Sequence, residues 1–156
     1  MATDLKADFW KRIDNVQAGL LTASGERPVP MAPQADPDDN AIWFITAAGT
    51  DPEKAAHGGA EAAFYVADPK ADIYANVEGR LEISNDSEKL DEVWNAFAAA
   101  WFEDGREDED VRLIKFTPHK AEVWLTESSA AFLYEVAKAN LTDDTPDGGD
   151  HGQITF

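Results

Sequence analysis

The sequence predicts an α+β domain in which mostly antiparallel strands form a barrel-like sheet and helices flank it. Short apolar or mixed runs are separated by turn sequences rich in Gly, Pro, Asp and Asn, which is typical of strands joined by turns. Helical patterns do not alternate regularly with these runs, so a parallel βαβ arrangement is not indicated. The chain of 156 residues is 44% hydrophobic, which suits one folded domain rather than a disordered acidic chain.

The first half of the chain is predicted to hold one short helix and then strands. Leu5, Phe9 and Ile13 recur at helical spacing, and Thr3 can cap the helix that they define. A further helix start is predicted at Asp51-Pro52-Glu53. The strands expected in this half are Val16–Thr22, Val29–Gln34, Ala41–Thr46 and Ala62–Ala67.

The clearest periodic signal runs from Ile73 to Ile83, where apolar and polar residues alternate strictly. This pattern predicts one long, half-buried strand in which Gly79 allows a bend. The segment Asn85–Glu88 then offers capping residues for an amphipathic helix that ends at Trp101 and Phe102. Its apolar stripe predicts that Trp101 points into the core.

The last third of the chain is predicted to close the domain. We expect two strands, Val111–Thr117 and Ala121–Thr126, around Pro118-His119, and a short helix over Ser129–Asn140. The single domain is therefore placed at residues 1–140. Asp, Gly, Thr and Pro dominate residues 141–156, which predicts an acidic, mobile tail unless a surface holds it.

The charge and composition exclude several classes of function. With 13 Lys and Arg against 31 Asp and Glu, the net charge of −18 disfavours nucleic-acid binding. Cysteine is absent, no signal peptide or membrane span is recognisable, and a cytoplasmic protein is expected. We expect no metal site, because His57, His119 and His151 are far apart and lack ligand spacing. Motifs of serine hydrolases and dinucleotide-binding folds are missing as well.

A few cations near strand ends are the candidates for holding a ligand phosphate. Arg27 precedes an apolar strand, and Lys54 follows the aromatic strand that ends at Thr46, next to a predicted helix start. The alternative is that both are ordinary surface residues. Trp124 has the opposite strand phase from Val123 and its apolar neighbours, so we expect it to point outward, toward a subunit interface or simply into solvent.

Five short segments, in this order and spacing, resemble one known family. They cover most of residues 3–135: Arg27–Ala32, the strand Ile42–Thr46 followed by Lys54, Tyr74–Gly79, Leu90–Phe102 and Ala121–Trp124. On these segments the chain resembles the pyridoxamine 5′-phosphate oxidase-like, FMN-binding split-barrel family, and within it the bacterial general stress protein branch.

The resemblance implies a split antiparallel β-barrel of Greek-key type with about six strands, which forms a homodimer with FMN between the subunits. FAD or another flavin is equally compatible. The resemblance places the ring along Pro30, Met31 and Ala32, and its ribityl and phosphate groups near Thr46, Lys54 and Arg27. The partner subunit supplies the aromatic side chain that matches Trp124. The pair Trp101 and Phe102 matches a Trp-Phe pair near the flavin or the partner, which is the alternative to a core position.

Two departures from the family pattern bear on function. Glu53 stands where many members have a second base, and its negative charge beside Lys54 is expected to weaken the grip on a flavin phosphate. Residues 126–132 contain no arginine to hold a substrate phosphate, so pyridoxamine phosphate oxidation is not expected. We interpret the chain as an FMN-binding homodimeric general stress protein, and its residues leave open whether it is a flavin-dependent oxidoreductase of unknown substrate. The alternative is a non-catalytic barrel that has lost flavin and acts as an acidic binding or stress-tolerance protein.

Overall fold

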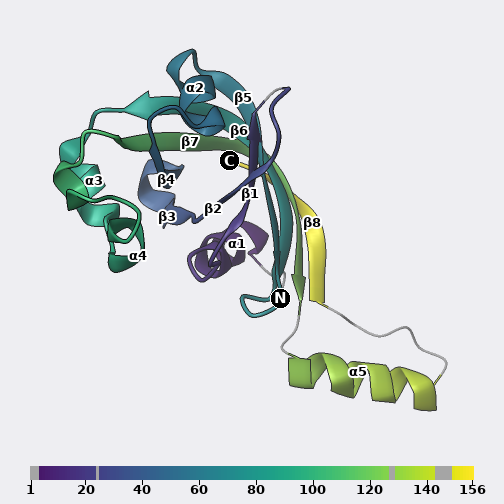
Figure 1. The fold of residues 1–156 in the computed structure, drawn as a ribbon. Coiled ribbons are helices and arrows are strands. Elements are labelled where there is room, and N and C mark those ends of the chain that lie inside the picture. The colour runs from purple at the N-terminus through teal and green to yellow at the C-terminus, as the bar shows by residue number, and fades with distance from the viewer. Residues whose placement is uncertain (1–3, 24, 127–128, 143–148) are drawn as a thin grey trace.

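The structure is a computed structural model that describes residues 4–23, 25–126, 129–142 and 149–156. Within these ranges the strands form one antiparallel sheet in the order β2-β1-β5-β6-β7-β4-β3, with β8 paired to β7. The sheet curls around its core, α1 lies within the curl, and α5 lies apart from the sheet (Figure 1). The predicted fold class, an α+β split barrel with flanking helices, is confirmed.

The strands and helices have the following bounds. The strands are β1 (Gly19–Ala23), β2 (Val29–Met31), β3 (Gln34–Asp36), β4 (Ala41–Ala47), β5 (Ala60–Asp68), β6 (Ile73–Ser84), β7 (Val111–Thr126) and β8 (Gly149–Thr155). The α-helices are α1 (Leu5–Ile13), α2 (Asp51–His57), α3 (Ser87–Val93), α4 (Ala96–Ala99) and α5 (Ser129–Leu141). Short 3₁₀ turns occupy Pro37–Asp39 and Gly105–Glu107.

Strand β6 is the alternating strand that the sequence predicted, and it pairs with β5 on one side and β7 on the other. Strand β7 differs from the prediction, because it runs unbroken through Pro118 instead of dividing into two strands. The register between β6 and β7 shifts at Glu78/Gly79, opposite Pro118. A Cβ atom at Gly79 would collide with the carbonyl oxygen of Thr117. Glycine at this bulge therefore lets the long strand continue.

The single helix predicted before Phe102 is wrong, because the chain breaks it into α3 and α4. Trp94 ends α3 in an extended conformation, with ψ of 132°. The Asn95 side chain then accepts a hydrogen bond from the backbone N–H of Ala98 at 2.9 Å, which starts a new helix. The break turns the following residues away from the predicted stripe, and Trp101 is 74% exposed instead of lying in the core.

Two smaller boundaries also differ from the prediction. Helix α1 is capped by Asp4, whose carboxylate accepts from the N–H of Ala7 at 3.0 Å, while Thr3 lies outside the described residues. The strand predicted over Val29–Gln34 is divided into β2 and β3. Pro33 lies between the two and has no N–H to continue the ladder.

The main core lies inside the curled sheet and is closed by α1. Phe44, Phe64 and Phe116 are fully buried there, and Phe44 meets the other two rings edge-on at centroid distances of 5.1 and 6.4 Å. From α1, Phe9 and Ile13 are also fully buried in this core.

A second apolar cluster attaches α3 to the sheet. Buried Trp43 packs there with partly buried Leu90 and Val93 of α3. Lys89 lies over the Trp43 ring at 5.7 Å and bonds the Asp36 carboxylate at 2.8 Å. Trp43 donates its indole N–H to the same carboxylate at 3.1 Å. Asp36, Trp43 and Lys89 together therefore join α3 to both β3 and β4.

The C-terminal residues differ from the predicted mobile tail where the structure describes them. Gly149–Thr155 form β8, which pairs with the second half of β7, and Ile154 is buried. The ring of Phe156 packs edge-on against Phe9 at 5.3 Å. Among the described residues, no helix is both long enough and apolar enough to cross a membrane.

Candidate ligand-binding site

A cavity of about 500 Å³ lies between the end of β4, the β2–β3 segment and the segment that begins at α4. Its volume is in the range typical of small-molecule sites. Among the residues that the structure describes, none of the side chains that line it is charged. They are Ala18, Pro30, Met31, Ala32, Gln34, Ile45, Thr46, Ala47, Thr50, Asn95, Ala98, Trp101 and Phe102.

One wall comes from β2, β4 and the chain after each. Pro30, Met31 and Ala32 line it together with Thr46, so the structure brings four of the predicted site residues to one place. Pro30 and Pro33, in and just after β2, have no N–H to donate to a ladder hydrogen bond. Strand β2 therefore stays short, and the backbone that follows it lies near the cavity.

The other wall comes from α4 and the turn that follows it. Trp101 and Phe102 both line the cavity, and the Phe102 ring lies 5.8 Å from the Trp94 ring. The sequence predicted a role for this pair either in the core or near a ligand. The core position of Trp101 is excluded by its exposure, and the cavity position follows from the break before α4.

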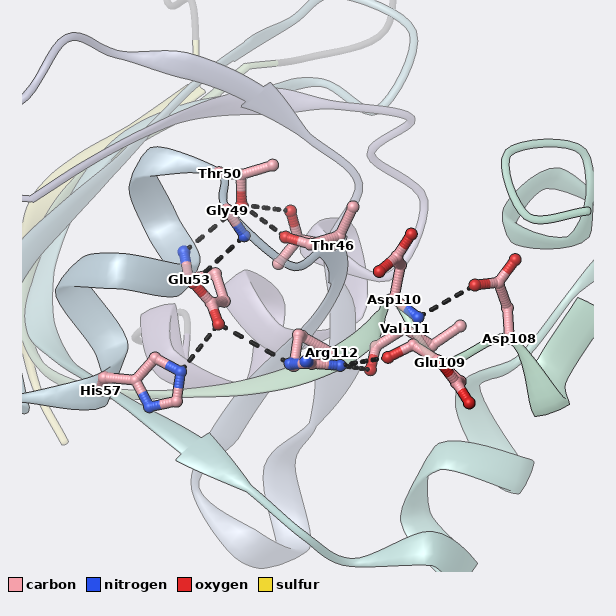
Figure 2. A network of polar contacts seen from close by, with 11 residues as sticks. Thr46, Gly49, Thr50, Glu53, His57, Asp108, Glu109, Asp110, Val111 and Arg112 are labelled. Carbon is pink, nitrogen blue, oxygen red and sulfur yellow. Dashed lines mark hydrogen bonds and ion pairs between the residues drawn. The ribbon is translucent and has the colours of Figure 1, made fainter.

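A pair of threonine hydroxyls forms one polar part of the cavity wall. It lies at the junction of β4 and α2 (Figure 2). The hydroxyl oxygens of Thr46 and Thr50 are 2.9 Å apart. Thr50 is also the N-cap of α2, since its hydroxyl accepts from the backbone N–H of Glu53 at 3.4 Å. The sequence Thr-Asp-Pro-Glu is a helix-start signal, but it does not show that Thr50 faces a cavity.

Behind the threonine pair lies Glu53, a carboxylate that is only 6% exposed. Its Oε1 atom is 2.7 Å from His57 Nε2 and 3.6 Å from Arg112 Nε, and its Oε2 accepts from the N–H of Gly49 at 3.3 Å (Figure 2). The hydrogen bond with His57 lowers the pKa of Glu53 most, against the opposing effect of burial, and Gly49 and Arg112 lower it further. Glu53 is therefore ionised and compensated within the fold.

The two predicted phosphate-binding cations do not line the cavity. Arg27 is exposed, and its Nε lies 3.2 Å from the carboxylate of Asp51, the residue that follows Thr50. Lys54 is exposed on α2, whereas its neighbour Glu53 points inward. Both cations thus lie at or near the start of α2, outside the lining of the cavity. Their role toward a ligand stays a prediction.

Trp124 lies on the outer face of the sheet, away from the buried residues of β7. Its neighbours Val123 and Leu125 are buried, and Trp124 itself is 37% exposed, as the strand phase predicted. The indole stacks on the His151 ring of β8 at a centroid distance of 4.8 Å, with 6° between the planes. Within one chain, Trp124 does not line the cavity described above.

Sequence reasoning missed Gln34, Thr50, Asn95 and Arg112. Arg112 reaches Glu53 only because β7 pairs with β4 in a register that places it opposite Thr46. No local pattern announces such a pairing between distant segments. Asn95 carried a usable signal, because asparagine is a preferred N-cap and here it interrupts an apparently continuous helix.

The lining suits a largely apolar ligand that carries a few polar groups. Aliphatic and aromatic side chains surround most of the cavity, and the threonine hydroxyls offer hydrogen bonds at one side. Across the part of the chain that the structure describes, His, Asp and Glu side chains form no group of three that could hold a metal ion.

This curled antiparallel sheet, with an apolar cavity at the end of β4, defines a split-barrel protein. The chain belongs to the family described as "Pyridoxamine 5′-phosphate oxidase like", whose model matches residues 4–147. The family predicted from the five segments is therefore confirmed. No match was found among the curated proteins.

Solved structures of general stress proteins are similar to the chain. One, assigned as general stress protein 26 from Jannaschia sp. CCS1, has 49% identity and a TM-score of 0.92, over 98% of this chain and 99% of that one. The general stress FMN/FAD binding protein from Xanthomonas citri has 27% identity and a TM-score of 0.72, over 82% of this chain and 93% of that one. A protein of Xanthomonas campestris pv. campestris, assigned to the general stress family, has 27% identity and a TM-score of 0.70, over 83% and 93%.

We predict that the protein loses stability in acid through two carboxylates. Burial acts to raise the pKa of Asp36, but the hydrogen bonds from Lys89 and Trp43 and the charge of Lys89 together lower it below its ordinary value of 3.8. The pKa of Glu53 lies below its ordinary value of 4.5. A lowered folded-state pKa contributes stability that is complete above the unfolded-state value and is lost as the pH falls through the folded-state value.

The free energy of unfolding should therefore fall as the pH drops below about 4.5, and urea unfolding between about pH 7 and pH 3 measures it. The double variant Asp36→Asn, Glu53→Gln should show a shallower decline than the parent. Asp38→Asn is the control, since Asp38 is an exposed acid close to Asp36 in the chain. An identical slope in the parent and the double variant would contradict the assignment.

Proposed function

We propose that the protein is a flavin-binding homodimer, with FMN as its ligand, and that it serves as a general stress protein of this family. The observation that carries the proposal is the cavity itself. Six residues that the family resemblance associates with flavin line this one uncharged cavity: Pro30, Met31, Ala32, Thr46, Trp101 and Phe102. The printed description of the Xanthomonas citri relative as an FMN/FAD binding protein supports the same ligand class.

Each wall would have a distinct task toward the flavin. The β2 segment at Pro30–Ala32 would lie along the ring, the aromatic pair Trp101 and Phe102 would exclude water from it, and Thr46 would bond a polar substituent. Arg27 and Lys54 would meet the phosphate outside the cavity, near the start of α2. When bound, a flavin supplies redox chemistry itself, so a flavin-dependent oxidoreductase needs no further catalytic side chain.

The outer face of the sheet supports the proposed dimer. Leu20, Tyr65, Tyr74 and Trp124 are each between 37% and 45% exposed. The register places Leu20 beside Tyr65 on adjacent strands, and Tyr74 beside Trp124. Large apolar side chains that share a face of a sheet are typical of a protein interface. A second copy of the chain would cover them and bring Trp124 to the partner's cavity.

A second candidate is a barrel without flavin that acts through its acidic surface. The observation that favours it is that the described lining of the cavity contains no cation, since Arg27 is paired with Asp51 and Lys54 is exposed. Purification without added cofactor separates the two functions. An absorption spectrum with flavin bands, and a flavin released on denaturation and identified by its mass, support the first candidate. A colourless protein that takes up neither FMN nor FAD on titration supports the second.

Lys54→Ala is expected to weaken FMN binding by about 1.5–3 kcal/mol, the range for a hydrogen bond to a charged group. Riboflavin, which has no phosphate, should bind both proteins equally. Quenching of flavin fluorescence on titration measures both affinities. Lys70→Ala is the control, because Lys70 is an exposed lysine between β5 and β6. Unchanged FMN affinity in Lys54→Ala would remove Lys54 from the site.

A further inference from the structure

Glu53 is buried, although its neighbours in the sequence suggest an exposed residue. As the residue beside Lys54, it looks like a negative charge that repels a phosphate. In the structure its side chain is buried in the fold, and its carboxylate meets three groups from different parts of the chain (Figure 2). These groups are the N–H of Gly49 from the β4–α2 turn, the His57 ring from α2 and the Arg112 guanidinium from β7.

The turn that Glu53 holds is the one that carries the threonine pair. Gly49 has a φ of 87°, a left-handed conformation that favours glycine, and it directly precedes Thr50. The backbone N–H of Glu53 bonds the Thr50 hydroxyl, while its side chain bonds the N–H of Gly49. Glu53 therefore fixes both ends of the Gly49–Thr50 step, much as a capping box fixes a helix start.

The fixed turn also sets the direction of the hydroxyl groups. The Thr50 hydroxyl is 3.0 Å from the carbonyl oxygen of Ala47, which can only accept, so Thr50 donates its one hydroxyl hydrogen there. In the arrangement that satisfies both contacts, Thr46 donates its own hydrogen to the Thr50 oxygen, 2.9 Å away. The Thr46 oxygen is then left with lone pairs, and Thr46 lines the cavity.

We propose that Glu53 is a positioning residue for the ligand, because it holds the Gly49–Thr50 turn so that the Thr46 oxygen faces the cavity as a hydrogen-bond acceptor. The bound molecule must then present an N–H or O–H group at that point. The inference rests on the proposed function, in which the ligand is a flavin. A flavin offers such a donor both in its ring imide and in its ribityl hydroxyls.

The negative charge of Glu53 is paired with groups of the protein itself and does not face the ligand. Arg112 donates to the backbone carbonyls of Glu109 and Val111 at 2.7 and 2.9 Å, so it is itself fixed beside Glu53. Glu53 thus has a rigid counter-charge on one side and His57 on the other. Loss of its charge leaves Arg112 and the Gly49 N–H with a weaker partner and frees the turn.

The variant Glu53→Gln tests the proposal through the sign and the ligand dependence of its effect. A positioning role predicts that both riboflavin and FMN bind about tenfold to a hundredfold more weakly. If Glu53 instead acted as a charge that repels the phosphate, FMN would bind more tightly and riboflavin would be unchanged, which would overturn the proposal. Glu61→Gln is the matched control, because Glu61 is an exposed acid 3.9 Å from Arg80 and is not among the residues that line the cavity.

A double-mutant cycle separates positioning from a general loss of stability. In a Thr50→Val background the hydroxyl relay is already broken, so Glu53→Gln should cost no further flavin affinity, although it still lowers the urea midpoint. Equal losses of affinity in both backgrounds would overturn the proposed route. Should Glu53→Gln fail to fold, Glu53→Asp keeps the charge but shortens the reach to Gly49, and unchanged affinity in that variant would overturn the role.

The source of the ligand's donor is decided by a third probe, lumiflavin, which has the flavin ring with a methyl group in place of the ribityl chain. If the ring imide donates to Thr46, Glu53→Gln weakens lumiflavin as much as riboflavin. If a ribityl hydroxyl donates, only riboflavin is affected. A parent protein that binds none of the three flavins would overturn the proposed function together with this inference, whereas normal binding by the parent and by Glu53→Gln would overturn this inference alone.

Discussion

Replacing Trp124 with alanine is expected to weaken the proposed dimer by about 2–4 kcal/mol, which is typical of a central aromatic residue at an interface. Trp124 is held by its stack on His151 and lies beside Tyr74 on an exposed face of the sheet. Its ring therefore loses little conformational freedom on association. Because the partner's Trp124 would complete the cavity, flavin affinity should fall together with the dimer.

Sedimentation measures the first effect, and flavin titration at the same concentrations measures the second. The parent should sediment at twice the mass of one chain at micromolar concentration, and Trp124→Ala should dissociate in that range. Tyr134→Ala is the control, since Tyr134 is 67% exposed on α5, which lies away from the curled sheet (Figure 1). A parent that stays monomeric throughout would remove the two-subunit site.

Phe44→Ala is expected to lower the free energy of unfolding by about 3–5 kcal/mol, the usual range for a fully buried phenylalanine. Phe44 lies in the middle of β4 and contacts the rings of Phe64 on β5 and Phe116 on β7. Truncation leaves a cavity between three strands that are fixed by their hydrogen-bond ladders, so the core cannot collapse to fill it.

Urea unfolding followed by tryptophan fluorescence measures this loss. Leu133→Ala is the control, because Leu133 is 67% exposed and its truncation should change the free energy of unfolding by no more than about 0.5 kcal/mol. A loss below about 1 kcal/mol in Phe44→Ala would show that the core repacks around the missing ring.

The sequence predicted those elements whose patterns are local. The alternation of apolar and polar residues was sufficient to predict β6, because one face of this strand is buried along most of its length. The helical stripe continued through Trp94 and Asn95 and so concealed the break between α3 and α4, which depends on a cap hydrogen bond. Strand β8 is mostly polar, with Ile154 as its buried residue, and it is held by backbone pairing to β7. No hydrophobic period could have shown it.

In the candidate site, too, the residues with a local sequence signal could be predicted, and those that depend on long-range pairing could not. Pro30–Ala32 and Thr46 could be predicted because they belong to short segments that resemble the family. The contact of Glu53 with Arg112 could not, since it requires the register of β4 on β7. Reasoning from neighbours in the chain assigned Glu53 a repulsive charge beside Lys54. In the structure Glu53 is buried, whereas Lys54 is exposed.

The pairing of β4 with β7 also has a consequence for how fast the protein folds. It joins Ile42 to Phe116, whereas the β5–β6 hairpin joins Asp68 to the nearby Ile73. Closing the large loop between β4 and β7 costs entropy before any contact rewards it, and sheets dominated by such pairings fold in about milliseconds to seconds. We expect the hairpin to form early and β4 to dock late, so the wall of the cavity that contains Thr46 is completed only in the final, slow phase of folding.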